Sequence, residues 1–188
     1  HPAIVGAVAI LAVNDHVLVV DDDPDVRTIV KSTIEKAGLK AAEASNGQAA
    51  LDWLSKHSPP ALILLDLMMP VMDGFAVLER VKANPRLRDI PIIVISAMSD
   101  LESVVKGIKS GAEDYLPKPF EPTLLQARIT ACLEKKFLRD QQRKLLHTFA
   151  SKAVADLLMD DGLSLGGRQI DASIMFTDVR SFTPLSEK

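Results

Sequence analysis

The chain has 188 residues, 47% of them hydrophobic, so it is long enough for one compact domain with an extension of some tens of residues. Its 22 Lys and Arg against 25 Asp and Glu give a net charge of -3, which argues against direct binding to nucleic acid. A single cysteine, Cys132, excludes an internal disulfide, and we expect a cytoplasmic protein.

Residues 1–15 form an N-terminal extension whose apolar run over 3–13 is too short for a transmembrane helix. We expect an extra strand or a turn of helix there, and no membrane partner for this part of the protein. Because the chain begins with His1 rather than methionine, we also expect it to be a piece of a longer protein.

From His16 onward, short runs rich in Val, Ile and Leu alternate with stretches of helical period, the first of which stops at Gly38. The predicted strands cover residues 17–20, 39–44, 61–65, 90–95 and 114–116. Apolar strands separated by helices predict an α/β fold, with a doubly wound five-stranded parallel sheet covered by helices on both faces.

Polar residues follow four of these strands: Asp21, Asp22 and Asp23 after the first, Asp66 after the third, Ser96 after the fourth and Lys118 after the fifth. Parallel sheets place ligands beyond the carboxyl ends of their strands, so these side chains are expected at one edge. Gathered carboxylates suit Mg²⁺, beside which one aspartate can attack phosphorus as a nucleophile.

Each of these residues also has a simpler interpretation. One acid of the first group can cap the helix that begins near Pro24, Ser96 can cap the helix that begins near Asp100, and Lys118 can be a solvated loop lysine. Their order and spacing along the chain favour a common site.

The stretches VLVVDDDPDVR, LILLDLMMPVMDGF, IIVISA and GAEDYLPKPF resemble, in order and spacing, four signature blocks of bacterial response-regulator receiver domains. The resemblance covers residues 16–134 and implies a flavodoxin-like receiver fold. It also implies a sensor histidine kinase or phosphotransfer protein as partner.

By position, the resemblance implies that Asp66 is the phosphoacceptor, that Lys118 binds the phosphoryl group, and that Ser96 and Tyr115 are the switch residues. It implies that Asp21, Asp22, Asp66 and the backbone carbonyl of Met68 hold Mg²⁺. A cis bond is expected between Lys118 and Pro119, and the fourth helix, fifth strand and fifth helix are expected to form the readout surface.

Residues 135–165 are predicted to continue the last helix as a linker. Leu138 and Leu145 are seven residues apart, the spacing of a coiled coil, which favours a homodimer through this linker. Residues 166–188 contain RQIDASIMFTDVRSFTPLSEK, which resembles the start of class III adenylate and guanylate cyclase domains, with Asp178 as a metal ligand. This resemblance implies a cyclase catalytic domain in the parent protein. The 188 residues alone would not be an enzyme.

Three alternatives remain open. A haloacid dehalogenase-like phosphatase would use Asp21 and Asp23 as nucleophile and acid but would leave Asp66 without a role. A DNA-binding regulator would need a basic helix-turn-helix after the linker, which the sequence lacks. A receiver that is never phosphorylated would serve as a docking module.

Overall fold

The computed structural model describes residues 16–97 and 101–149 as five strands that alternate with helices. The elements are β1 (His16–Val20), α2 (Pro24–Lys36), β2 (Lys40–Ala44), α3 (Gly47–Lys56), β3 (Leu62–Leu65), α4 (Gly74–Ala83), β4 (Ile92–Ser96), α5 (Leu101–Lys109), β5 (Asp114–Pro117) and α6 (Pro122–Phe149). All five predicted strands are confirmed, with starts shifted by at most two residues. The predicted N-terminal extension, residues 1–15, lies outside the described residues.

The five strands form one parallel sheet in the order β2-β1-β3-β4-β5. The order reverses at β1, so the carboxyl ends of β1 and β3 lie side by side at the point where such sheets bind ligands. The predicted doubly wound α/β fold is therefore confirmed.

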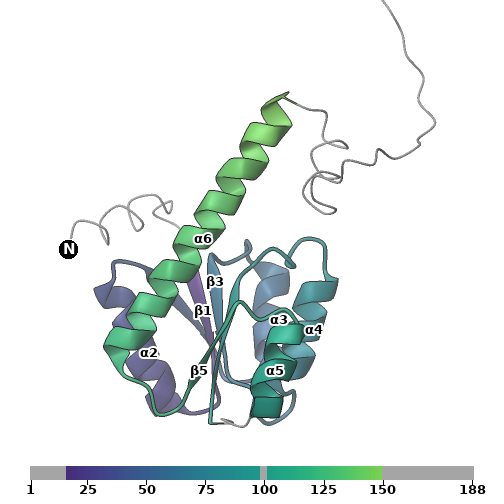
Figure 1. Cartoon of the computed structure of the whole chain (residues 1–188). Helices are drawn as coiled ribbons and strands as arrows, with labels where there is room; N and C mark the ends of the chain where they lie inside the picture. Colours follow the sequence, from purple (N-terminus) through teal and green to yellow (C-terminus); the bar gives the residue numbers. More distant parts are fainter. Residues whose placement is uncertain (1–15, 98–100, 150–188) are drawn as a thin grey trace, which may run out of the picture. The chain divides into compact units, whose positions relative to one another are not determined.

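Helices cover both faces of the sheet, with α2 and α6 on one side and α3, α4 and α5 on the other (Figure 1). Successive residues of a strand point to opposite faces, so β1 sends Val17 and Val19 to one core, and Leu18 and Val20 to the other. β1, β3 and β4 are buried on both faces, as predicted. β2 is an edge strand and exposes Lys40 and Glu43.

Local signals explain the bounds of α2. The side chain of Asp23 accepts hydrogen bonds from the backbone N–H groups of Asp25 and Val26, and Pro24 occupies the first helical position. The helix ends before Gly38, whose φ of 81° is a backbone conformation that glycine adopts without steric cost.

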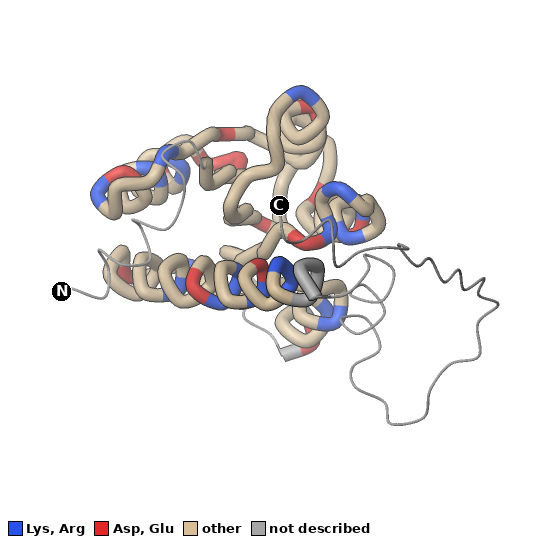
Figure 2. The backbone as a smooth tube through the Cα atoms, turned by 90° about the horizontal axis from the view of Figure 1, so that it is seen from above, with Lys and Arg blue, Asp and Glu red and all other residues tan. Residues whose placement is uncertain are grey.

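The last helix, α6, is 28 residues long and continues past the residues that pack on the sheet. Over 122–145, the part of the helix whose side chains are described, the buried residues are Leu125, Ile129, Cys132 and Leu133. Beyond them the helix extends past the edge of the sheet, and basic and acidic residues alternate along it (Figures 1 and 2). Within residues 16–97 and 101–149, no helix has the length and apolar character needed to cross a membrane.

Candidate functional site

The two central strands each end in an acid. Asp21 follows β1 and Asp66 follows β3, and the two strands pair in register up to Val20 and Leu65. The backbone N–H of Asp66 donates to the carbonyl of Val20 at 2.8 Å, and that of Asp21 donates to the carbonyl of Ala44 at 3.2 Å. Because the sheet's hydrogen bonding extends through both acids, their backbone positions are fixed by the core.

Asp22 joins these two acids in one cluster. Each of Asp21, Asp22 and Asp66 offers a carboxylate oxygen, and these oxygens lie within 4.8 Å of one another. Asp21 and Asp66 are buried, whereas Asp22 is exposed, so the cluster opens to solvent on one side. An open site of three carboxylate oxygens is the kind of donor set that Mg²⁺ prefers.

Lys118 supplies the positive charge of the site. Its Nζ donates to Asp21 Oδ2 at 2.7 Å and to Asp66 Oδ2 at 2.6 Å. The side chain comes from the loop after β5, and the Lys118–Pro119 peptide bond is cis, as expected. The structure therefore brings together Asp21, Asp22, Asp66 and Lys118, four of the residues that the sequence placed at this edge.

Burial and this contact shift the ionisation of both partners. Burial raises the pKa of the Asp21 carboxyl above its usual value, although the hydrogen bond from Lys118 acts in the opposite direction. Burial alone would lower the pKa of Lys118, but the hydrogen bonds to Asp21 and Asp66 raise it. Lys118 is therefore a permanent cation at neutral pH.

Ser96 and Tyr115 lie on the strands next to the cluster. Ser96 is fully buried at the end of β4, and its carbonyl accepts a hydrogen bond from the backbone N–H of Lys118 at 2.8 Å. Tyr115 is buried on β5, in the core that faces α3, α4 and α5. Ser96 therefore lies at the end of β4 and Tyr115 within β5, and the role of both residues as a switch remains a prediction.

The loop after β3 folds closely around Asp66. The backbone N–H of Met68 donates to Asp66 Oδ1 at 3.1 Å, and that of Gly74 donates to the carbonyl of Leu67 at 3.0 Å. A Cβ on Gly74 would overlap the carbonyl oxygen of Asp66, so this position requires glycine. The Met68 carbonyl remains a predicted metal ligand.

A cavity of about 460 Å³ opens beside the cluster. Its walls include Asp22, Met68 and Asp73, and Asp73 also caps α4 by accepting from the backbone N–H of Ala76 at 2.8 Å. The exposed Met68 side chain forms part of its rim. The site is thus open to a partner molecule.

For Asp23 the simpler interpretation as a helix cap is correct, and Arg27 is a residue beside the site that the sequence analysis did not predict. Asp23 caps α2 and stands outside the carboxylate cluster. Arg27 donates from Nη1 to the backbone carbonyls of Asp21 at 2.7 Å and Asp22 at 3.0 Å, which holds the acidic loop in place. The available signal was its position one turn into α2, where a long side chain reaches back to the N-terminal loop.

Two predicted features fall outside the described residues. Asp178 and the whole segment 166–188 lie there, as does the linker beyond residue 149.

The family model of the response regulator receiver domain matches residues 17–130. The chain is 38% identical over 122 residues to the DNA-binding dual master transcriptional regulator RpaA of Synechocystis sp., covering 63% of this chain and 49% of the relative. The chain thus spans about half the length of the curated relatives it matches.

The fold is also that of solved receiver domains, of which two are given as examples. The receiver domain of the Francisella response regulator 1452 superposes with a TM-score of 0.60 at 32% identity, covering 65% of this chain and 98% of that one. The signal receiver domain of a signal transduction histidine kinase from Syntrophus aciditrophicus superposes with a TM-score of 0.60 at 33% identity, covering 64% of this chain and 91% of that one. Similar domains therefore occur in a transcriptional regulator and in a signal transduction histidine kinase.

Proposed function

This chain belongs to the response regulator receiver domain family, and on that premise we propose that Asp66 accepts a phosphoryl group from a sensor histidine kinase or a phosphotransfer protein. The observation that carries the proposal is the 2.6 Å contact between Lys118 Nζ and Asp66 Oδ2 inside a cluster of three carboxylates. A receiver domain is not itself a catalytic enzyme, so Asp66 takes up one group and holds it as a signal.

In the proposed reaction, a carboxylate oxygen of Asp66 forms a bond to phosphorus while the bond between phosphorus and the donor histidine nitrogen breaks. The imidazole leaves with the bonding electron pair and takes up a proton from solvent. Lys118, which now contacts the Asp66 carboxylate, is placed to donate to the incoming phosphoryl oxygens.

The donor set fits a divalent cation. Receiver domains bind Mg²⁺ at an acidic cluster, and here Asp21, Asp22 and Asp66 would hold it, together with the proposed Met68 carbonyl. When bound, Mg²⁺ supplies positive charge that lowers the repulsion between the carboxylates and the phosphoryl oxygens. Arg27 keeps the Asp21 and Asp22 backbone in position for this role.

The proposed switch uses Ser96 and Tyr115. A phosphoryl group on Asp66 adds acceptor oxygens that the Ser96 hydroxyl can meet only if its loop shifts toward them, and Tyr115 then repacks. The proposed readout surface comprises α5, β5 and α6. Val105 and Ile108 on α5 and Leu124 on α6 are exposed apolar residues that a partner bound to this surface would cover.

The proposed domain organisation places an extension at 1–15, the receiver at 16–134, a helical linker at 135–165 and the start of a cyclase domain at 166–188. Support for a homodimer through the linker comes from Leu138 and Leu145, which are both exposed on α6 and seven residues apart. The cyclase output rests on the sequence resemblance around Asp178. In the complete protein, cyclisation of ATP or GTP that is lost on Asp178→Ala would support it.

A second candidate output is DNA binding, because RpaA is a DNA-binding regulator. DNA binding by the complete protein, without nucleotide cyclisation, would favour this candidate over the cyclase. The phosphatase alternative is set aside, because Asp23 caps α2 and the chain belongs to the receiver family.

The test uses a small phosphodonor such as acetyl phosphate with Mg²⁺ and follows intact mass and dimer content. We expect one added phosphoryl group in the wild-type chain and none in Asp66→Asn. The matched control is Asp52→Asn, an exposed aspartate on α3, which should label like the wild type. Label retained in Asp66→Asn would refute Asp66 as the acceptor, and no label in the wild type would favour the docking module. Dimer content that ignores phosphorylation would weaken the proposed route through the linker.

A further inference from the structure

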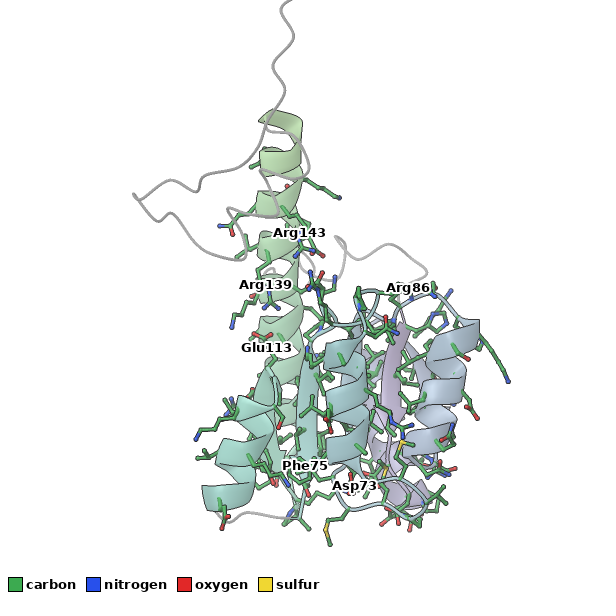
Figure 3. All side chains as sticks on the ribbon, turned by 90° about the vertical axis from the view of Figure 1, so that its right-hand side faces the viewer. Asp73, Phe75, Arg86, Glu113, Arg139 and Arg143 are labelled. Atoms are coloured by element: carbon green, nitrogen blue, oxygen red, sulfur yellow. The ribbon has the colours of Figure 1, made fainter. Side chains whose placement is uncertain are left out.

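Asp66 lies at the carboxyl ends of the strands. At the opposite, amino ends of β4 and β5, two acids face the long helix α6. Glu113, just before β5, accepts from Lys135 Nζ at 2.6 Å and from Arg139 Nη2 at 3.1 Å. Asp89, in the loop before β4, accepts from Arg143 Nη1 at 2.7 Å. Figure 3 shows Glu113, Arg139 and Arg143 together along α6, with Asp73 and Phe75 at the far end of the domain.

Both acids stand on backbone that the domain holds in place. Lys82, at the end of α4, donates from Nζ to the carbonyls of Arg88 at 3.0 Å and Ile90 at 2.8 Å, one on each side of Asp89. The backbone N–H of Glu113 donates to the carbonyl of Ile92 at 2.8 Å, which ties it to β4. The loops therefore present the two carboxylates in fixed positions.

The part of α6 that these acids contact has little else to hold it. Up to Leu145, the last buried residues of the helix are Cys132 and Leu133, and none of the residues from 134 to 145 is buried. A protruding helix without apolar burial is marginal in water, so a few ion pairs can decide its direction. The Glu113 side chain is only 15% exposed, which strengthens its pairs relative to fully solvated ones.

We infer that Glu113 and Asp89 form an acidic clamp, with Lys135, Arg139 and Arg143 as its counterparts, that fixes the direction in which α6 leaves the domain. These are positioning residues, and the inference goes beyond phosphate acceptance at Asp66. Strands β4 and β5 connect the clamp to the site around Asp66. β4 begins after the Asp89 loop and ends at Ser96, and β5 begins after Glu113 and ends just before Lys118, so each strand joins one clamp acid to one residue of the site. The direction of α6 is thereby tied to the β4–β5 part of the sheet.

The test measures the distance between two spin labels by pulsed electron paramagnetic resonance. One label is attached at Gln142→Cys on α6 and the other at Lys56→Cys, an exposed residue on α3. Cys132 can stay, because it is buried and burial raises the pKa of its thiol to about 12. We expect a single narrow distance distribution whose width grows about twofold in the Glu113→Gln, Asp89→Asn variant.

Three comparisons separate the clamp from other causes. Glu134→Gln removes a carboxylate that forms no ion pair within the described part of the chain, and it should leave the width unchanged. Lys135→Gln, Arg139→Gln and Arg143→Gln together remove the same three pairs from the α6 side and should broaden the distribution equally. NaCl at about 1 M, which screens exposed charges, should broaden the wild-type distribution.

Equal widths in the wild type and the acid-side variant would overturn the clamp. Broadening with the acid-side variant but not with the triple α6-side variant would overturn it too, because altered loops rather than ion pairs would then be the cause. The measurement does not involve phosphate, so its outcome is independent of whether Asp66 is the acceptor.

Discussion

Replacing Gly74 by alanine tests how tightly the loop after β3 is packed around Asp66. The added Cβ would overlap the carbonyl oxygen of Asp66 and lie 2.8 Å from the Cα of Leu67. Both atoms are backbone, so no flexible side chain can move aside, and we expect an overpacking cost of about 3 kcal/mol. Because Gly74 is the first residue of α4, the helix-propensity gain of alanine over glycine is at most the value of about 1 kcal/mol for a helix interior, which leaves a net loss of at least about 2 kcal/mol.

The assay is urea unfolding followed by the fluorescence of Trp53, the single tryptophan of the chain. A loss of about 2 kcal/mol corresponds to a fall in Tm of about 8 °C for a domain of this size. The control is Gly107→Ala in α5, where the nearest heavy atom to the new Cβ is Tyr115 Cδ2 at 3.8 Å, so stability should rise by about 0.5–1 kcal/mol. An unfolding free energy of Gly74→Ala within about 0.5 kcal/mol of the wild type would refute the reasoning.

Three further predictions concern charge and reactivity. Burial alone would raise the pKa of Glu113, but Lys135 and Arg139 hold the pKa below the ordinary value of 4.5. The stability that these ion pairs contribute is therefore present above pH 4.5 and is lost as the pH falls through the pKa of Glu113 in the folded chain. In urea unfolding, Glu113→Gln should therefore lose less stability below pH 4.5 than the wild type does. Cys132, whose pKa burial raises to about 12, should react with a thiol reagent at pH 8 only after unfolding, and rapid labelling of the folded chain would contradict its burial. Mg²⁺ at about 100 times its Kd should stabilise the chain by about 2.7 kcal/mol, and chelation should remove the gain; an equal gain in Asp22→Ala would contradict a role for Asp22 as ligand.

Much of the site could be predicted because it depends on position along strands. The alternation of apolar runs and helical stretches predicted a parallel sheet, and in such a sheet the residues after β1, β3 and β5 meet at one edge. Asp21, Asp66 and Lys118 are therefore in contact although they are far apart in the chain. The signals for caps and helix stops at Asp23 and Gly38 are local, so they too are visible in the sequence.

By itself, the sequence determined the order of elements, the edge at which the acids gather and the chemistry that such acids support, because strand and helix periods are local properties of the chain. Only the tertiary structure decided that Arg27 holds the acidic loop and that Glu113 and Asp89 meet Arg139 and Arg143. The Asp89–Arg143 pair joins residues 54 positions apart, and each partner alone is an ordinary surface charge. Such pairs form only where packing fixes the angle of α6 against the sheet, and that angle follows from the combined shape of many buried side chains rather than from any one stretch of sequence.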